Sequence, residues 1–219
     1  MDTLGLLSAS ELFRHFDPEV VDRISRATRE LTFERNDRIF GEGDHASELY
    51  VVRSGRVAIA KRSGDGRESV VALMEEGDLF GDMGLFDGEG RSAEARALER
   101  STLVCVPYPP IRAMFENDPS LLWTVVSFLS RRLRATDSAL ADAVFLDVTG
   151  RTAKRLLELA GDNDDFMMPL TQEELAAMVG ASRERVNKAL AAFVRLGWIN
   201  QSDRRYHITN RHELEHRSQ

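Results

Sequence analysis

The most regular pattern of apolar positions in this chain lies within residues 117–149. Its members recur in alternating steps of four and three residues, and we call them the seam: Leu122, Val126, Leu129, Leu133, Thr136, Leu140 and Ala143. Such steps predict a long helix that pairs with another helix, rather than one that only faces its own core. Asp118 and Pro119 are suited to begin a helix of roughly 28 residues, because Asp caps free N–H groups and Pro fits the first turn. Thr136, the polar member, either fixes the register or contacts a ligand at the subunit boundary.

From Thr32 to Pro107 the pattern changes to short, β-branched segments that alternate in part between apolar and polar residues. They lie at residues 48–53, 56–61, 68–74 and 103–107. Glycines that suit turns occur every eleven or twelve residues in this region, at positions 43, 55, 66 and 77. This spacing is typical of an antiparallel sandwich or barrel. It predicts a β-roll of the jelly-roll type, preceded by a short amphipathic helix that begins at residues 17–19.

The strand pattern breaks at residues 80–94, which are rich in glycine. Glycine permits positive φ and a close approach of the backbone, and a short helix over residues 83–86 would present free N–H groups. Arg91 and Ser92 add a cation beside a hydroxyl. Together these features suit one phosphate group, although a plain long hairpin fits the glycines alone equally well.

Helical signals return at the C-terminal end of the chain. Asp147 is suited to cap a helix over residues 150–160, and Thr171 with Glu174 forms a capping-box pattern. Gly180 marks a tight turn, after which Ser182 is suited to cap a second helix. This arrangement predicts a helix-turn-helix.

The second helix of that pair has two distinct faces. Its core positions are Val186, Leu190 and Phe193, and its predicted solvent positions are Arg183, Glu184, Asn187 and Lys188. Two short apolar segments then flank Arg204 and Arg205, which predicts a hairpin wing that carries two arginines for the DNA backbone. The predicted architecture is α+β, with an N-terminal antiparallel β-roll, a long dimerisation helix and a C-terminal winged helix-turn-helix. The expected boundaries are 1–116, 117–147 and 148–219.

The formal net charge of −7 hides an uneven distribution. Residues 150–219 carry a net charge of +1 and residues 1–149 carry −8, so the acidity lies in the N-terminal part. Residues 183–211 contain seven basic and two acidic side chains, a local charge of +5. A basic patch of this kind is what contact with phosphates requires, so we expect the C-terminal part to bind double-stranded DNA.

The composition of the chain excludes several classes of protein. No apolar run approaches the roughly 18–20 residues that span a bilayer, and the N-terminus lacks the pattern of a secretory signal, so we expect a cytoplasmic protein without a membrane partner. Cys105 is the only cysteine of the 219 residues. It cannot form an internal disulfide or hold a cysteine-ligated iron–sulfur cluster, and we expect it to lie in the core.

Three motifs in order resemble the cyclic AMP receptor protein (CRP/FNR) family of transcription regulators, over essentially the whole chain. They are a phosphate-binding cassette at residues 81–86 and 91–93, a joint at residues 145–151, and the segment from Ser182 through Val186 to Lys188. Residues 180–190 are similar to actinobacterial members. The resemblance implies a homodimer that binds a palindromic, TGTGA-like site, works with RNA polymerase, and takes cyclic AMP as its effector.

The resemblance also implies the ligand contacts. Arg91 and Ser92 would bind the cyclic phosphate, helped by backbone N–H groups near Gly81 and Met83. Asp82 would accept the ribose 2′-hydroxyl, with support from Arg132; family members usually have Glu there, and the loop before Arg91 is one residue shorter than in the enterobacterial receptor. Thr136 would reach the adenine, and Asp137 would come from the partner subunit, either to accept an amino N–H or to oppose an anionic ligand.

The implied DNA contacts lie on the helix-turn-helix and the wing. Arg183 would pair with guanine, Glu184 would accept from cytosine N4, and Lys188 would contact a further guanine or a phosphate. The full expected set is Thr171, Ser182, Arg183, Glu184, Asn187, Lys188, Arg204 and Arg205.

Two alternatives remain at this point. A cupin-like metalloenzyme needs converging ligands, but the five histidines are dispersed, at positions 15, 45, 207, 212 and 216. We therefore expect no enzyme activity, no metal and no haem. The closer alternative keeps the DNA-binding dimer but removes the effector, or replaces it by another one.

Overall fold

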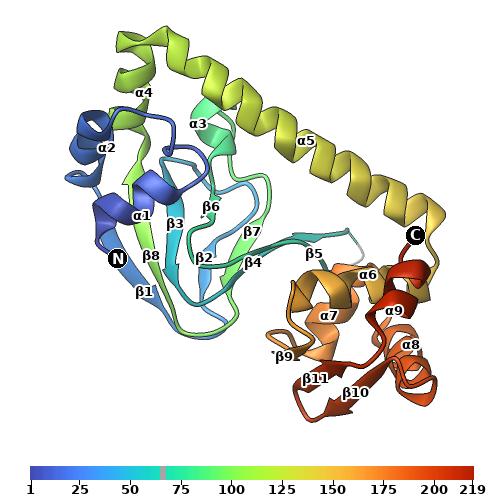
Figure 1. Ribbon diagram of the computed structural model, residues 1–219. Coiled ribbons are helices and arrows are strands. Elements are labelled where there is room, and N and C mark those ends of the chain that lie inside the picture. Colours follow the sequence, from blue (N-terminus) through green and yellow to red (C-terminus); the bar gives the residue numbers. More distant parts are fainter. Residues whose placement is uncertain (65–67) are drawn as a thin grey trace. The chain divides into compact units, whose positions relative to one another are not determined.

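The computed structural model describes residues 1–64 and 68–219 (Figure 1). The described residues form two compact units. The N-terminal unit contains the residues up to 64 and Val71–Leu133, and the C-terminal unit contains residues 68–70 and Arg134–Gln219. The division falls within the long helix rather than at its ends, so the three expected domain boundaries stay a prediction.

Two antiparallel four-stranded sheets form the N-terminal unit (Figure 1). The first has the order β1-β8-β3-β6, with bounds Arg29–Phe33, Ser101–Pro107, Glu48–Ser54 and Leu79–Phe80. The second has the order β2-β7-β4-β5, with bounds Arg38–Phe40, Glu94–Ala97, Val57–Arg62 and Glu68–Met74. The four predicted strand segments are confirmed. Gly43, Gly55 and Gly77 have positive φ, and Gly66 lies outside the described residues.

The central strand β3 is buried on both sides, which explains why its apolar and polar residues alternate only in part. Tyr50 and Val52 pack with Phe80 and Cys105 between the two sheets. Leu49 and Val51 face the opposite way, into a second core. Because strand side chains alternate between faces, both faces must be apolar when each is covered. Cys105 is a core residue as expected, and burial raises the pKa of its thiol to about 12.

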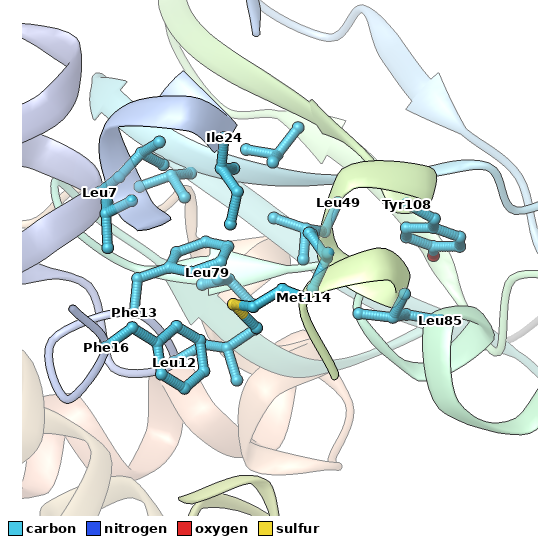
Figure 2. Packing of buried hydrophobic residues seen from close by; sticks show 14 of the residues in the cluster. Leu7, Leu12, Phe13, Phe16, Ile24, Leu49, Leu79, Leu85, Tyr108 and Met114 are labelled. Atoms are coloured by element: carbon cyan, nitrogen blue, oxygen red, sulfur yellow. The ribbon is translucent and has the colours of Figure 1, made fainter. Parts of the chain in front are cut away.

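Helices cover the outer face of the first sheet (Figure 2). They are α1 at Thr3–Ala9, α2 at Pro18–Ser25 and α4 at Tyr108–Asn117. Asp17 caps α2 as predicted, whereas α1 and α4 were not identified from the pattern. Figure 2 shows Leu7, Phe13 and Ile24 from the N-terminal segment packed close to Leu49 and Met114.

The long helix α5 runs from Leu122 to Phe145. Its start differs from the prediction: Asp118 caps a single 3₁₀ turn, Pro119–Leu121, and the α-helix begins after it with 24 residues rather than 28. Val125 and Phe128 are buried in the N-terminal unit. The seam residues, in contrast, are exposed; Leu133 and Leu140 are 62% and 64% exposed.

The C-terminal unit is a winged helix-turn-helix, as predicted. Its helices are α6 (Val148–Ala160), α7 (Gln172–Val179), α8 (Arg183–Arg195) and α9 (Arg211–Arg217). A three-stranded antiparallel sheet has the order β10-β11-β9, with bounds Ile199–Ser202, Arg205–Ile208 and Asp165–Met167. Asp147, Thr171 and Ser182 cap α6, α7 and α8, which confirms all three caps.

Candidate ligand cassette and nucleic-acid interface

We refer to residues 81–92 as the cassette. It begins after β6 and includes the short helix α3, Met83–Asp87, which confirms the predicted turn of helix. Gly84 has no room for a side chain, because a Cβ atom there would lie 2.5 Å from Ala46 Cβ and 2.8 Å from the Glu89 carbonyl oxygen. Gly84 therefore permits two loops to approach closely, as the glycines in the sequence predicted.

Arg91 is 6% exposed and lies at the centre of the cassette. Its Nη1 donates to the Gly81 carbonyl oxygen and its Nη2 to that of Glu48, both at 2.8 Å. The guanidinium carbon lies 4.2 Å from the centroid of the Phe40 ring. Nε is buried without a hydrogen-bond partner among the described residues. The position of Arg91 is thus fixed, while one strong donor keeps spare capacity.

The other expected phosphate ligand, Ser92, is exposed. Its hydroxyl donates to Met83 Sδ over 3.2 Å. A thioether is a weak acceptor, so an anionic oxygen would replace it at little cost. The cassette therefore places a buried cation that has one unpaired N–H next to a weakly held hydroxyl.

Asp82 and Arg132 form an ion pair that ties the cassette to α5. Asp82 is 1% exposed, and its two carboxylate oxygens accept from Arg132 Nη1 at 2.8 and 2.9 Å. Asp82 makes no capping bond to α3. Arg132 also lines a cavity of about 890 Å³ with Phe128, Met74 and Leu79. Its described lining also includes Ala9, Glu11 and Arg14 of the N-terminal segment and none of the cassette residues.

Thr136 and Asp137 lie further along α5, in the C-terminal unit, and both are exposed. Their expected ligand contacts remain predictions.

Sequence reasoning missed the aromatic residues that hold Arg91. Tyr108 Oη donates to the Gly81 carbonyl oxygen, and Arg91 Nη1 lies 3.3 Å from that hydroxyl. Burial raises the pKa of Tyr108, which keeps it a proton donor. Phe40 and Tyr50 lie under the guanidinium. No local signal identifies these residues, because each comes from a different strand or helix.

On the helix-turn-helix, Thr171 Oγ1 accepts from Glu174 N and Thr171 N donates to the Glu174 carboxylate, which completes the capping box. Gly180 has a left-handed conformation in the turn between α7 and α8. Arg183, Glu184 and Lys188 are exposed on α8, while Val186 and Phe193 on the same helix are buried. The predicted division of α8 into two faces is correct for these residues.

Two expected DNA contacts have surroundings that the sequence did not indicate. Asn187 is half-buried rather than fully exposed, and its Oδ1 has no hydrogen-bond partner among the described residues. Arg204 donates from Nε and Nη2 to the Met168 carbonyl oxygen, and from Nη2 to that of Pro169. Arg204 and Arg205 are both exposed, but Arg204 is bonded in this way to the segment before α7.

Comparison with known proteins identifies both units. Residues 30–118 match the cyclic nucleotide-binding domain and residues 150–217 match the Crp-like helix-turn-helix domain. The CRP-like cAMP-activated global transcriptional regulator of Mycobacterium tuberculosis is 34% identical over 97% of this chain and 98% of its own. This chain belongs to the CRP/FNR family.

Further members of the CRP/FNR family are similar to it. The cAMP-activated global transcriptional regulator Vfr of Pseudomonas aeruginosa is 31% identical over 82% of this chain and 89% of its own. The solved structure of the c-di-GMP responsive global regulator CLP from Xanthomonas campestris is 26% identical in sequence and has a TM-score of 0.75. The match covers 88% of this chain and 99% of that one. These relatives are transcription regulators, so the metalloenzyme alternative is not supported.

No helix among residues 1–64 and 68–219 is both long and apolar enough to cross a bilayer. No group of three or more His, Cys, Asp or Glu side chains in the same part of the chain is arranged to hold a metal ion.

Proposed function

We propose that this chain is a homodimeric transcription regulator whose DNA affinity is controlled by a cyclic nucleotide that binds the cassette. The observation that carries the ligand site is the buried Nε of Arg91, which has no hydrogen-bond partner among the described residues. An unpaired buried donor is costly, and a phosphate oxygen would satisfy it. Ser92, held only by a thioether, supplies a second donor beside it.

Cyclic AMP is the effector we propose. Two relatives at 31–34% identity are described as cAMP-activated. Asp82 offers a carboxylate for a ribose hydroxyl, and the Arg132 side chain that bonds it is 40% exposed. In this proposal Thr136 contacts the base from α5.

The exposed seam of α5 supports the homodimer. Leu122, Val126, Leu129, Leu133 and Leu140 are 40–64% exposed, although all are large apolar side chains. A stripe with steps of four and three fits the same stripe on a second copy. Ligand binding would favour one packing of the paired helices, and this packing would set the spacing of the two α8 helices.

The α8 helices would then lie in successive major grooves, about 34 Å apart, of a TGTGA-like palindrome. Arg183 would pair with guanine and Glu184 with cytosine, while Lys188 would contact a further guanine or a phosphate. Thr171, Ser182 and Arg205 would contact the DNA backbone, with Asn187 beside the bases. The regulator would act in the cytoplasm with RNA polymerase.

A regulator active without an effector is the second candidate. One observation favours it: Arg91 and Asp82 have strong hydrogen-bond partners within the chain itself. A cassette held in this way can fix the fold by itself.

One titration tests both candidates. A labelled TGTGA palindrome and a scrambled duplex are titrated with the protein alone, and with saturating cyclic AMP, cyclic GMP or c-di-GMP, at one salt concentration. We expect cyclic AMP to tighten binding to the palindrome about 5–150-fold, with little change on the scrambled duplex. Calorimetry with each nucleotide reports binding directly. Equal palindrome affinity in all arms, with no heat of binding, would instead establish the effector-independent regulator.

A further inference from the structure

The seam assigns a position in a heptad repeat to every residue of α5. Steps of four then three place Leu122, Leu129 and Thr136 at d positions, and Val126 and Leu133 at a positions. The edges of the seam are then the g positions, which include Arg132, and the e positions, which include Asp137. These edge positions are where interhelical ion pairs form in coiled coils.

The two edges of the seam have different surroundings. On the g edge, Val125 is 4% exposed and Arg132 donates to Asp82, so this edge faces the protomer's own N-terminal unit. On the e edge, Trp123 is 75% exposed and Asp137 is exposed. No hydrogen bond or ion pair of Asp137 is found within the described part of the chain. One edge is covered in cis, and the other is open to a partner.

We propose that Arg132 of each protomer forms an ion pair with Asp137 of the partner subunit. In a parallel pair of helices, a g residue faces the e residue of the partner's next heptad, five positions further along the chain. Residue 132 therefore faces residue 137. The inference rests on the proposed homodimer, whose two α8 helices must lie at the same end of the pair to reach one operator.

The side chain of Arg132 permits this second contact. It is 40% exposed, so a carboxylate from outside the protomer can reach it, and its Nη1 donates to both carboxylate oxygens of Asp82. A guanidinium carries five N–H donors in a planar fork and can hold two carboxylates at once. Arg132 would then lie between Asp82 of its own cassette and the partner's helix.

The consequence is a ligand site that a single chain cannot complete. A ligand hydroxyl that engages Asp82 would change the geometry of Arg132, and through it the pairing of the two helices. Asp137 would act on the ligand through Arg132 and not by direct contact, which makes it a positioning residue. The competing arrangement is an intrahelical pair of Asp137 with Arg134, three residues before it on α5.

A double-mutant cycle on the full-length protein separates these arrangements. The dimer dissociation constant is measured by sedimentation for wild type, Arg132→Gln, Asp137→Asn and the double variant, at 0.1 and 1 M NaCl. We expect each single change to raise the constant about five-fold, since the dimer contains two exposed pairs. The dissociation constant of the double variant should not exceed that of the single variant with the higher constant. The coupling energy should disappear at high salt.

The matched control replaces Arg134, which carries the same charge at a position off the seam. In a second cycle, Arg134→Gln and Asp137→Asn should show no coupling. Coupling in this second cycle, or losses in the first that multiply to about 25-fold, would overturn the interhelical pair. A wild-type protein that remains monomeric would overturn the homodimer as well, whereas a dimer without Arg132–Asp137 coupling would overturn this inference alone.

Discussion

The cassette and the exposed face of α8 both contain charged side chains, but two of those in the cassette are buried and bonded within the chain, whereas those of α8 are open to solvent. Arg91 and Asp82 are 6% and 1% exposed and are bonded to Gly81, Glu48 and Arg132. Arg183, Glu184 and Lys188 are exposed on a helix whose other face is packed.

The difference teaches how each site would bind. A buried, bonded arginine is ordered before the ligand arrives, so little entropy is lost on binding, but its removal also damages the fold. Exposed side chains lose their freedom only when DNA binds, so replacing one changes affinity and leaves the fold intact. Substitutions in the two regions should therefore separate stability from binding.

The largest effect is expected from Arg91→Ala. It should lower cyclic AMP affinity about 100-fold and the free energy of unfolding by about 2–4 kcal/mol, because two buried carbonyl groups lose a charged donor. Calorimetry and urea unfolding measure the two losses. Arg91→Lys is the control: it keeps the charge but cannot bond both carbonyl groups and the phosphate. Unchanged ligand affinity in Arg91→Ala would refute the cassette assignment.

Arg183→Ala should lower affinity for the palindrome by about 1–3 kcal/mol, roughly 5–150-fold, through the loss of one base contact. The melting temperature should not change, because Arg183 is exposed. Fluorescence anisotropy on the palindrome, and on duplexes with the contacted guanine replaced, checks this result. An equal loss on all sequences would assign Arg183 to the DNA backbone instead.

The two arginines of the wing, Arg204 and Arg205, allow the same comparison in consecutive residues, between a bonded side chain and one without a bonded partner among the described residues. Arg204→Gln should reduce stability by about 1 kcal/mol, because it removes the donor that bonds the Met168 and Pro169 carbonyl groups. Arg205→Gln should leave stability unchanged and reduce the slope of log affinity against log salt by about one. Thermal unfolding and salt titrations separate the two. A reversed pattern would mean that Arg204, not Arg205, contacts the phosphate.

The smallest effect is expected at Asp147, which caps α6 where Asp82 does not cap α3. The hydrogen bond from Gly150 N, with Arg217 nearby, holds the pKa of Asp147 below its usual range. A lowered pKa contributes stability that is present above the unfolded value, about 3.9, and is lost as the pH falls through the folded value.

Asp147→Asn keeps the cap but removes the charge. It should destabilise the protein by about 0.5 kcal/mol at neutral pH, and the difference should disappear in acid below the folded pKa. Urea unfolding across this pH range measures it. A constant difference at every pH would show that the cap, not the charge, was affected.

The sequence by itself determined the elements and their order. The period-two segments became strands, the capping box and Gly180 set the helix-turn-helix, and the steps of four and three marked the exposed stripe of α5. These features follow from local spacing, which a chain carries wherever it is folded. The chemical character of the cassette could also be predicted, because its glycines and Arg91 are consecutive or nearly so.

Only the tertiary structure decided which partners the charged side chains have. Arg91 bonds the carbonyl group of Glu48, 43 residues earlier, and Asp82 meets Arg132, 50 residues later. The role of Arg204 was likewise set by contact with a segment 36 residues earlier in the chain. The physical reason is that such partners depend on the register of sheets and the packing of helices across the core, which periodicity along the chain does not contain.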